Sequence, residues 1–323
     1  MAYTIDVHLS ADEVRSQMRT DALQGLQGDE KSIPPVWFYD ERGSRLFEEI
    51  TQLPEYYPTR AERALLEAHA PAIAELSKAD TLVELGAGAC DKTRVLLTAL
   101  QETGMLSRYV PFDVSDEFLR SAATALSREY DALDIHVVIG DFHQHLGEIP
   151  SEGRRMIAFL GGTIGNLDPA QRARFLFDLN CTMSSDDSLL LGTDLVKDPS
   201  RLVAAYDDAA GVTADFNRNV LRVLNEQLGG DFHPDNFRHV ALWNEQQQWI
   251  EMRLRAEGAA EVSLAHAGIT VRFDEGEDLL TEISAKFTPK RVERELSEAG
   301  FVVEEMWGAQ DGEFLLSLAH PYC

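Results

Sequence analysis

Between Asp80 and Leu195, short apolar runs alternate with segments whose apolar residues recur at helical spacing, and this alternation limits what the chain can fold into. The helical segments span residues 91–103, 115–129 and 169–182. Strand–helix alternation with strands that are apolar throughout is typical of a parallel sheet covered by helices on both faces. The runs that we expect to be strands are Thr81–Leu85, Tyr109–Asp113, Ile135–Ile139, Met156–Leu160 and Ser188–Asp194.

The pattern changes after Asp198. Helical stretches rich in Asp, Asn and Arg give way to strand-like alternation, as in Ile250–Leu254, and this continues as far as Lys286. The chain then returns to an α/β pattern, with a helix near 289–299 and strands at 301–306 and 313–319. The turn at 308–312 joins these two strands so closely that they are expected to form an antiparallel hairpin.

A mostly parallel sheet closed by such a hairpin is associated with methyltransferases, and dinucleotide dehydrogenases usually lack the hairpin. We therefore expect an α/β fold with a Rossmann-like class I methyltransferase sheet and an inserted α+β substrate-binding domain. The aromatic and proline clusters of the first sixty residues are expected to join the insertion. The expected domains are 1–60 (N-terminal part of the substrate-binding domain), 61–196 (methyltransferase core), 197–286 (inserted substrate-binding domain) and 287–323 (C-terminal part of the core).

The charge of the chain bears on its partners. The 323 residues include 55 acidic and 29 basic side chains, which give a formal net charge of −26. Such a surface repels phosphate backbones and anionic lipid, so we expect a small-molecule substrate and neither a nucleic-acid nor a membrane partner. The start of the chain lacks the basic and apolar segments of a signal peptide, which favours a cytoplasmic protein. We expect a monomer.

A glycine turn follows the first of these strands. Glu84-Leu85-Gly86-Ala87-Gly88 leads into a helix, and glycines there allow the backbone to approach a ligand closely. A tight strand–helix turn without a ligand would look the same. A dinucleotide fingerprint needs a third glycine where this chain has Asp91, and two carboxylates suit a cationic sulfonium better than a pyrophosphate. Lys92 is placed to meet a ligand carboxylate, although an exposed surface lysine is the simpler interpretation.

Acidic side chains also follow the next two strands. Asp113 ends the second strand, where a carboxylate can accept from both ribose hydroxyls. Asp141 and Phe142 follow the third strand and could hold an adenine amino group and ring face. Each alone would be an ordinary strand-end residue, but the carboxyl ends of neighbouring parallel strands meet at one edge of a sheet. The three positions and the glycine turn therefore predict one crevice.

The loop after the fourth strand, Gly161–Asn166, is glycine-rich and offers the amide of Asn166. Its glycines would clear space for a methyl acceptor, although a plain connecting loop would have the same sequence. The chain shows no Ser–His or Cys–His pairing that would demand a covalent intermediate. Direct displacement at a methyl carbon would then depend mostly on positioning.

Over nearly its whole length the chain resembles the histidine Nα-methyltransferases of ergothioneine biosynthesis, which use S-adenosylmethionine to trimethylate free L-histidine to hercynine. The resemblance implies this activity, S-adenosylmethionine as methyl donor, and no metal. The long motifs that carry the resemblance are Pro35–Asp40, Leu53–Arg60, Gly161–Leu167, Leu191–Asp198, Ala204–Thr213 and Leu280–Phe287.

The resemblance also implies roles for individual residues. Glu282 and Ser284 are alternate residues of an expected strand and would hold the two imidazole nitrogens from one face. The family's hydroxyl-bearing residues in the glycine turn are replaced here by Ala87, Ala89 and Cys90. The implied cofactor-binding residues are Gly86, Lys92, Asp113, Asp141 and Phe142. The implied substrate-binding residues are Tyr56, Asn166, Tyr206, Met252, Glu282 and Ser284, and the implied catalytic residues are Tyr39, Tyr56 and Asn166.

Other interpretations remain open from the residues alone. A nicotinamide-dependent oxidoreductase would share the glycine turn and Asp113, and a protein that holds histidine without turnover would share the substrate residues. Among methyltransferases, the acceptor could be another free amino acid such as tyrosine or tryptophan. His143 and His145 are too few for a metal site, and Cys90 is expected to be a packing residue and not a redox thiol, because neighbouring acids raise its pKa.

Overall fold

The computed structural model describes residues 3–88, 90, 92–309 and 311–322. The chain divides into two compact units. The first unit comprises residues 1–9, 58–196 and 286–323, and the second unit comprises residues 10–57 and 197–285. Each unit is therefore built from segments that are far apart in the sequence.

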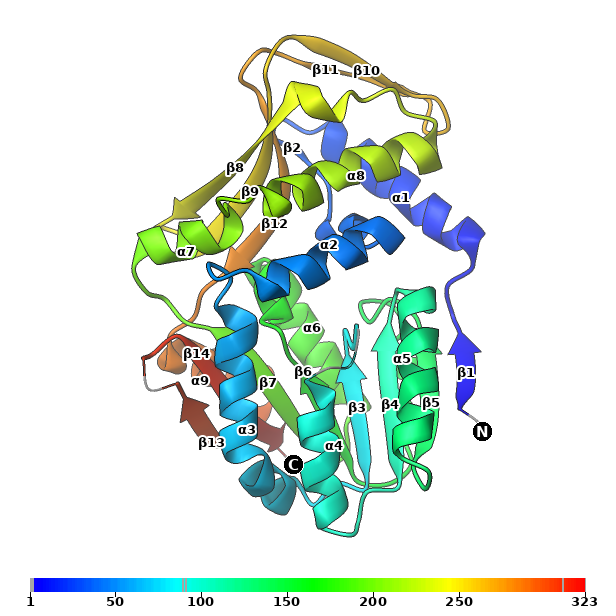
Figure 1. Cartoon of the computed structure of the whole chain (residues 1–323), viewed down its shortest axis with the longest axis vertical. Coiled ribbons are helices and arrows are strands. Elements are labelled where there is room, and N and C mark those ends of the chain that lie inside the picture. The colour runs from blue at the N-terminus through cyan, green and yellow to red at the C-terminus, as the bar shows by residue number, and fades with distance from the viewer. Residues whose placement is uncertain (1–2, 89, 91, 310, 323) are drawn as a thin grey trace. The chain divides into compact units, whose positions relative to one another are not determined.

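The centre of the first unit is a twisted sheet in the order β1-β5-β4-β3-β6-β7-β14-β13 (Figure 1). Within this sheet, β14 runs antiparallel to both of its neighbours, and the other described pairs are parallel. The strands are β1 (Thr4–Val7), β3 (Thr81–Leu85), β4 (Arg108–Asp113), β5 (Asp134–Ile139), β6 (Arg155–Phe159), β7 (Ser188–Asp194), β13 (Phe301–Gly308) and β14 (Phe314–Pro321).

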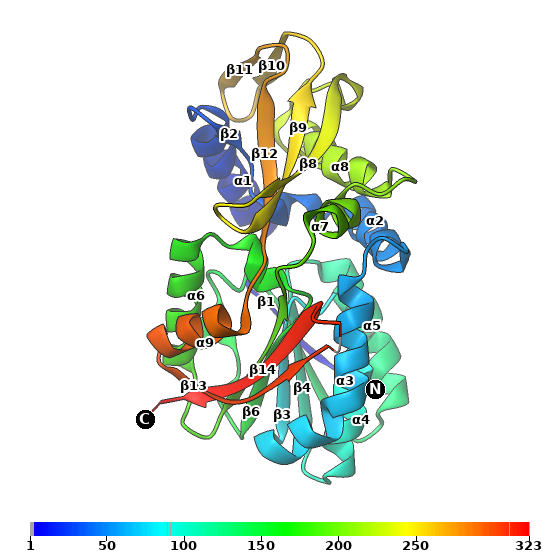
Figure 2. The same ribbon diagram turned by 90° about the vertical axis from the view of Figure 1, so that its left-hand side faces the viewer.

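Helices cover both faces of this sheet, as expected from strands buried at every position such as β3, β6 and β7. Figure 2 shows α3, α4 and α5 on one face and α6 and α9 on the other. The helices are α3 (Pro58–Ser77), α4 (Thr93–Glu102), α5 (Asp116–Glu129), α6 (Pro169–Thr182) and α9 (Pro289–Glu298), with short 3-10 turns η2 (Leu146–Glu148) and η3 (Thr163–Asn166).

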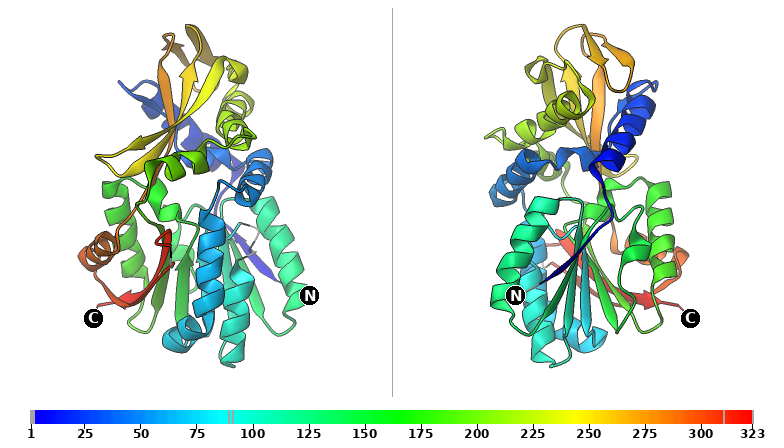
Figure 3. Two further views of the ribbon diagram at one scale, coloured as in Figure 1. Left: turned by 60° about the vertical axis from the view of Figure 1, so that its left-hand side comes forward. Right: turned by 90° about the vertical axis from the view of Figure 1, so that its right-hand side faces the viewer.

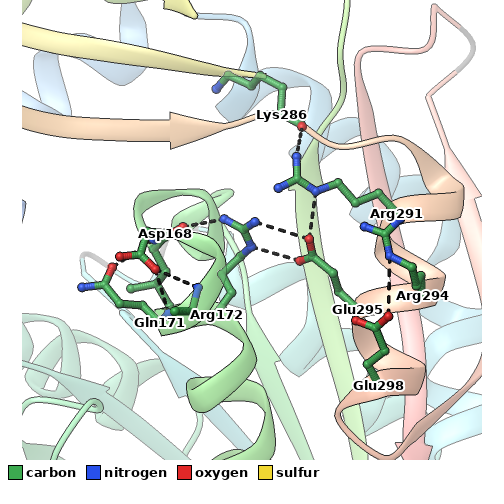
Figure 4. Close-up of polar contacts among 10 residues, drawn as sticks. Asp168, Gln171, Arg172, Lys286, Arg291, Arg294, Glu295 and Glu298 are labelled. Carbon is green, nitrogen blue, oxygen red and sulfur yellow. Dashed lines mark hydrogen bonds and ion pairs between the residues drawn. The ribbon is translucent and has the colours of Figure 1, made fainter. Parts of the chain in front are cut away.

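Helices α6 and α9 are joined by the ion pair of Arg172 with Glu295 (Figure 4). The guanidinium of Arg172, which is almost fully buried, donates Nε to Glu295 Oε2 at 2.9 Å and Nη2 to Glu295 Oε1 at 3.3 Å. Arg172 also donates to the carbonyl of Leu167, and Arg291 donates both to Glu295 and to the carbonyl of Lys286. A buried fork of this kind fixes the loop before α6 as well as the two helices.

The sheet predicted from the sequence is confirmed. The expected strands match β3 to β7 to within one residue at either end, and the C-terminal segment forms the expected antiparallel hairpin. Within the expected hairpin turn, Gln310 lies outside the described residues. Of the range 1–60, which we expect to belong to the substrate-binding domain, residues 1–9 and 58–60 lie in the first unit, where Thr4–Val7 pairs in parallel with β5.

The second unit is a smaller α+β structure (Figure 3). A sheet in the order β2-β12-β9-β8 is flanked by helices, and β10 and β11 form a separate hairpin. Residues 10–57 lie in this unit together with the insertion, and β2 pairs with β12. The elements are α1 (Ala11–Leu26), β2 (Lys31–Ser32), η1 (Pro35–Phe38), α2 (Glu41–Gln52), α7 (Pro199–Tyr206), α8 (Val212–Leu228), η4 (Pro234–Asn236), β8 (Phe237–Asn244), β9 (Trp249–Ala256), β10 (Ala260–Leu264), β11 (Ile269–Phe273) and β12 (Asp278–Ala285).

Helix α8 is the central helix of the second unit. Its buried Asn219 donates from Nδ2 to Asp40 Oδ1 at 2.7 Å and to the carbonyl of Phe38 at 3.4 Å. The helix thereby holds the N-terminal segment on both sides of Tyr39. In the described part of the chain, no helix is long and apolar enough to cross a membrane.

Candidate functional site

The glycine turn after β3 owes its shape to positive φ angles. Gly86 and Gly88 have φ of +72° and +51°, and no atom of the described residues, their own chain neighbours aside, lies within 4 Å of a Cβ placed on either of them. Glycine is therefore required at these positions for backbone conformation, and space remains open beside the turn. Gly86 N donates to the carbonyl of Phe112 at 2.8 Å, which fixes the turn against β4. Ala89 and Asp91, on which two of the expectations rest, lie outside the described residues.

Beneath the turn lies a buried cluster of polar side chains. Glu84 accepts hydrogen bonds from the hydroxyls of Thr93 and Tyr109, and burial raises its pKa to about 6. Cys90 has a φ of +57°, unusual for a residue other than glycine, and its Sγ lies 3.3 Å from the Tyr109 hydroxyl. Burial, more than the carboxylates of Glu84 and Asp113, raises the pKa of the Cys90 thiol. Cys90 is therefore a packing residue, as predicted, but burial is the larger cause.

Asp113 ties the end of β4 to the glycine turn. Its Oδ2 accepts from Gly88 N at 2.9 Å and its Oδ1 accepts from Ser115 N at 3.0 Å. Burial raises the pKa of this carboxyl above its usual value, although these amides act in the opposite direction. The side chain remains partly exposed beside the turn. Its position is the one from which a strand-end carboxylate can reach the hydroxyls of a nucleoside.

Asp141 and Phe142 follow β5, the next strand of the sheet. Asp141 accepts from His143 N at 2.9 Å and from Gln144 Nε2 at 3.1 Å, and Phe142 packs edge-on against Phe159 at a centroid distance of 5.4 Å. Because β3, β4 and β5 are adjacent and parallel, the turn and the residues that follow β4 and β5 lie at one edge of the sheet. The predicted cofactor residues are thus brought to the same edge.

Glu62 is a member of this edge that the sequence reasoning missed. Its carboxylate is fully buried, forms an ion pair with Lys92, and accepts from Gly161 N at 2.7 Å. A Cβ on Gly192 would lie 2.2 Å from Glu62 Oε1, so the absence of a side chain there makes room for the carboxylate. Glu62 precedes the buried Leu65 and Leu66 by three and four residues, which places it on the apolar face of α3. That spacing was the available signal.

The loop after β6 contains the predicted acceptor residue Asn166. Gly161 and Gly162 have φ of +76° and +68°, and a 3-10 turn then leads to Asn166, which is half-buried. A Cβ on Gly161 would lie 3.6 Å from Lys92 Nζ, so this loop and the glycine turn approach each other at Glu62. Glu62 therefore links the predicted cofactor edge to the predicted acceptor loop.

In the second unit, the predicted tyrosines form one aromatic chain. Tyr39 contacts Phe47 edge-on at 5.8 Å, Phe47 contacts Tyr56 at 6.2 Å, and Tyr56 contacts Tyr206 at 6.1 Å. These edge-to-face distances are those that aromatic pairs favour. The sequence reasoning missed Phe47, whose aromatic character between two tyrosine-bearing motifs was the only signal. Segments from the N-terminal region and the insertion thus converge on one set of rings.

The row of aromatic rings ends in polar side chains on the sheet of the second unit. The hydroxyl of Tyr206 is 2.7 Å from Ser284 Oγ, and either atom can donate. Glu282 pairs with Met252 and Ser284 with Ile250 across β12 and β9, so these four side chains share one face. Glu282 and Ser284 are 8% and 6% exposed, which makes an unpaired polar atom there costly. The second unit therefore brings together its five predicted substrate residues (Tyr56, Tyr206, Met252, Glu282 and Ser284) and Tyr39.

The histidines near β5 have roles within the fold. The ring of His145 contacts that of His8, with centroids 6.0 Å apart, and its Nδ1 lies 3.1 Å from the backbone of Asp141. Burial lowers the pKa of His143. Across the described residues, no group of three or more His, Cys, Asp or Glu side chains is arranged to hold a metal ion.

The chain is similar to several known proteins. A family model described as "Histidine-specific methyltransferase, SAM-dependent" matches residues 18–321. The chain is 53% identical to a histidine N-alpha-methyltransferase of Mycobacterium tuberculosis over 99% of each chain. It is 30% identical to ergothioneine biosynthesis protein 1 of Neurospora crassa, over 70% of this chain and 26% of that one. An L-tryptophan methyltransferase of Psilocybe serbica is 28% identical over 97% of this chain and 96% of that one.

Proposed function

Because this chain belongs to the family of histidine-specific, S-adenosylmethionine-dependent methyltransferases, we propose that it trimethylates the α-amino group of free L-histidine to hercynine, a step of ergothioneine biosynthesis. The observation that carries the choice of histidine is the polar pair Glu282 and Ser284 on one buried face. A second candidate is another free amino acid such as tyrosine or tryptophan, which the similarity to a tryptophan methyltransferase favours.

The first unit supplies the residues that would hold S-adenosylmethionine. This cosubstrate supplies a methyl group made electrophilic by its sulfonium. The open space beside Gly86 and Gly88 lets the backbone approach it closely, and Asp113 would accept from both ribose hydroxyls. Lys92 would meet its carboxylate while remaining paired with Glu62, and Asp141 and Phe142 would hold the adenine. The carboxylate-rich surroundings of the turn favour a cationic ligand over a pyrophosphate.

The second unit would hold the imidazole of the substrate. One ring N–H would donate to the Glu282 carboxylate, and the other nitrogen would pair with the Ser284 hydroxyl, whose bond to Tyr206 orients it. Met252 and Tyr56 would pack against the ring. Asn166 and Tyr206 would fix the α-amino-carboxylate end.

Catalysis on this account consists of positioning and of removing one proton before each transfer. The attacking nitrogen must be a neutral amine, and its lone pair displaces the methyl group directly. Tyr39 and Tyr56 would relay each proton towards water. Their hydroxyls can each accept a proton and pass one on, and both tyrosines are among the predicted catalytic residues. Gly161 and Gly162 carry no side chains, which would leave the nitrogen room to rotate between rounds.

The rate should therefore rise with pH until the bound amine is deprotonated, and then level off. An α-amino group is less basic than a lysine side chain, whose pKa is about 10.4, so no strong base is required. Initial rates between pH 6 and 10 at saturating cosubstrate, with mass spectrometry of the products, test this expectation. A pH-independent rate, or a product that stops at monomethylhistidine, would contradict it.

Asp113→Ala should weaken the binding of S-adenosylhomocysteine about tenfold to a hundredfold, because charge-assisted hydrogen bonds contribute about 1.5–3 kcal/mol each. The variant also removes the acceptor for Gly88 N. Titration calorimetry measures the affinity, and Asp116→Ala, at the exposed start of α5, is the control. Unchanged affinity in Asp113→Ala would place the ribose elsewhere.

The proposed reaction requires only small molecules as partners. We propose that the protein works as a monomer in the cytoplasm and binds neither nucleic acid nor membrane, since a net charge of −26 repels both. Binding of S-adenosylhomocysteine without binding of NAD would dismiss an oxidoreductase. Transfer of a labelled methyl group to histidine would dismiss a protein that only binds histidine.

A further inference from the structure

Strand β12 contains one extra residue at the point where the proposed substrate residues begin. Leu280 pairs with Arg253, and Glu282 pairs with Met252, the next residue of β9, so Thr281 has no partner of its own. This is a β-bulge. In a regular strand, Glu282 would share the face of Leu280. Because the bulge shifts the alternation by one residue, Glu282 and Ser284 instead share the face of Leu279, which carries α7 and α8.

The side chain of the extra residue is bonded to helix α8. Thr281 Oγ1 lies 2.7 Å from Asn217 Oδ1 and 2.9 Å from the carbonyl of Met252, and Thr281 and Asn217 are 1% and 0% exposed. Asn217 Nδ2 lies 2.8 Å from His239 Nδ1 and 3.2 Å from the carbonyl of Arg253. His239 Nε2 lies 2.7 Å from the carbonyl of Tyr206. A chain of hydrogen bonds therefore leads from the bulge to Tyr206.

The backbone carbonyl groups at the ends of this hydrogen-bond network determine which atom carries each proton. The carbonyl of Arg253 can only accept, so the NH₂ group of Asn217 faces it, and Asn217 Oδ1 faces the hydroxyl of Thr281. The second proton of that NH₂ group goes to His239 Nδ1, which leaves His239 Nε2 to donate to Tyr206. Burial lowers the pKa of His239, in agreement with a neutral ring. All of these donors then have acceptors.

We propose that Thr281, Asn217 and His239 form a positioning network for the histidine site, without touching the substrate themselves. Thr281 shares its one hydroxyl proton between Asn217 Oδ1 and the carbonyl of Met252, and it thereby holds the bulge that turns Glu282 and Ser284 to the substrate face. His239 holds the backbone of Tyr206. This inference rests on the proposed function, because that function assigns those residues to the substrate. The network determines how tightly histidine is held and how well other amino acids are rejected.

The test compares Thr281→Val, which keeps the shape and removes the hydroxyl, with Thr281→Ser, which keeps the hydroxyl. Without a donor for Asn217 Oδ1 the bulge should relax, and the KM for L-histidine should rise about tenfold to a hundredfold. The ratio of kcat/KM for histidine to that for phenylalanine should fall in parallel. Thr281→Ser should stay within about threefold of the unchanged protein. The affinity for S-adenosylhomocysteine, measured by calorimetry, should stay the same in both variants.

Thr270→Val, the same change on the exposed face of β11, controls for the loss of a threonine hydroxyl in this unit. If Thr281→Val does not fold, Asn217→Asp replaces it, because it keeps the acceptor for Thr281 and removes the donors to His239 and to the carbonyl of Arg253. An unchanged KM and an unchanged selectivity ratio in a folded variant of either kind would overturn the inference. Turnover of histidine by the unchanged protein is measured first, so that failure of the proposed function is seen separately.

Discussion

Phenylalanine should be methylated about 10⁴-fold less efficiently than histidine, measured as kcat/KM, because a site built to hydrogen-bond a ring N–H rejects an analogue that lacks it by that order. Phenylalanine would bring an apolar ring against Glu282 and Ser284, which are 8% and 6% exposed. The carboxylate would then lose the hydrogen bond to a ring N–H at a position with little access to water, which is costly for a charged group. Initial rates with a labelled methyl donor give both constants. Equal turnover of the two amino acids would remove Glu282 and Ser284 from the imidazole site.

Glu282→Gln is the variant that isolates the charge. The amide keeps the size of the side chain and one acceptor oxygen, so histidine should still bind, but with a kcat/KM lowered about tenfold to a hundredfold. The discrimination against phenylalanine should narrow, since a neutral amide costs less to bury than a carboxylate. Glu261→Gln, at an exposed position of the β10–β11 hairpin, should change neither value.

Glu62→Leu should lower the free energy of unfolding by about 3 kcal/mol, near the lower end of the range for breaking a buried ion pair, because Lys92 keeps 22% exposure. It would also remove the acceptor for Gly161 N, so that the glycine turn and the loop after β6 lose their common support. The affinity for S-adenosylhomocysteine should fall with the stability. Denaturant unfolding followed by circular dichroism, together with calorimetry, measures both quantities.

Glu67→Leu on the same helix is the matched control. Glu67 pairs with Arg63 on the exposed face of α3, where ion pairs contribute little, so the loss should stay below about 1 kcal/mol. If Glu62→Leu were no more destabilising than Glu67→Leu, the buried pair would not support this edge of the sheet. If it lowered stability but left the cofactor affinity unchanged, Glu62 would be purely structural.

Much of the first unit could be predicted because its strands are apolar along their whole length. Ser188–Asp194, for example, is buried at every position and was predicted with the same limits. Such strands need helices on both faces and allow few other arrangements. The C-terminal hairpin followed from the short turn between its strands. Local sequence was therefore enough to predict an element where its own residues determine how it must be packed.

The parts that escaped prediction depend on distant partners. The four-residue strand β1 is exposed along most of its length, and only its pairing with β5 makes it a strand. In the sequence Glu62 looks like an ordinary helical glutamate. Its role depends on Lys92 and Gly161, which are distant in the sequence and contact it only in the fold. The bulge at Thr281 leaves no mark in the sequence, yet it decides which face Glu282 occupies.

The candidate site residues of the second unit were named from the family resemblance, and the structure adds how several of them are supported. In the second unit, the buried Asn217 and Asn219 of α8 hold the surroundings of Tyr206 and Tyr39 respectively, through His239 and through Asp40. The amide oxygen of Asn217 and both protons of its NH₂ group have partners, and a buried polar network that is satisfied in this way fixes one arrangement. The substrate roles themselves remain predictions.

One measurement tests the central claim most directly. The purified chain is incubated with S-adenosylmethionine and an equimolar mixture of the common free amino acids, and the products are identified by mass spectrometry with fragmentation. The account predicts that histidine alone gains methyl groups, that all of them are on the α-nitrogen, and that the trimethylated betaine is the end product. Methylation of tryptophan, tyrosine or another amino acid in preference to histidine, or methylation of an imidazole nitrogen, would contradict it.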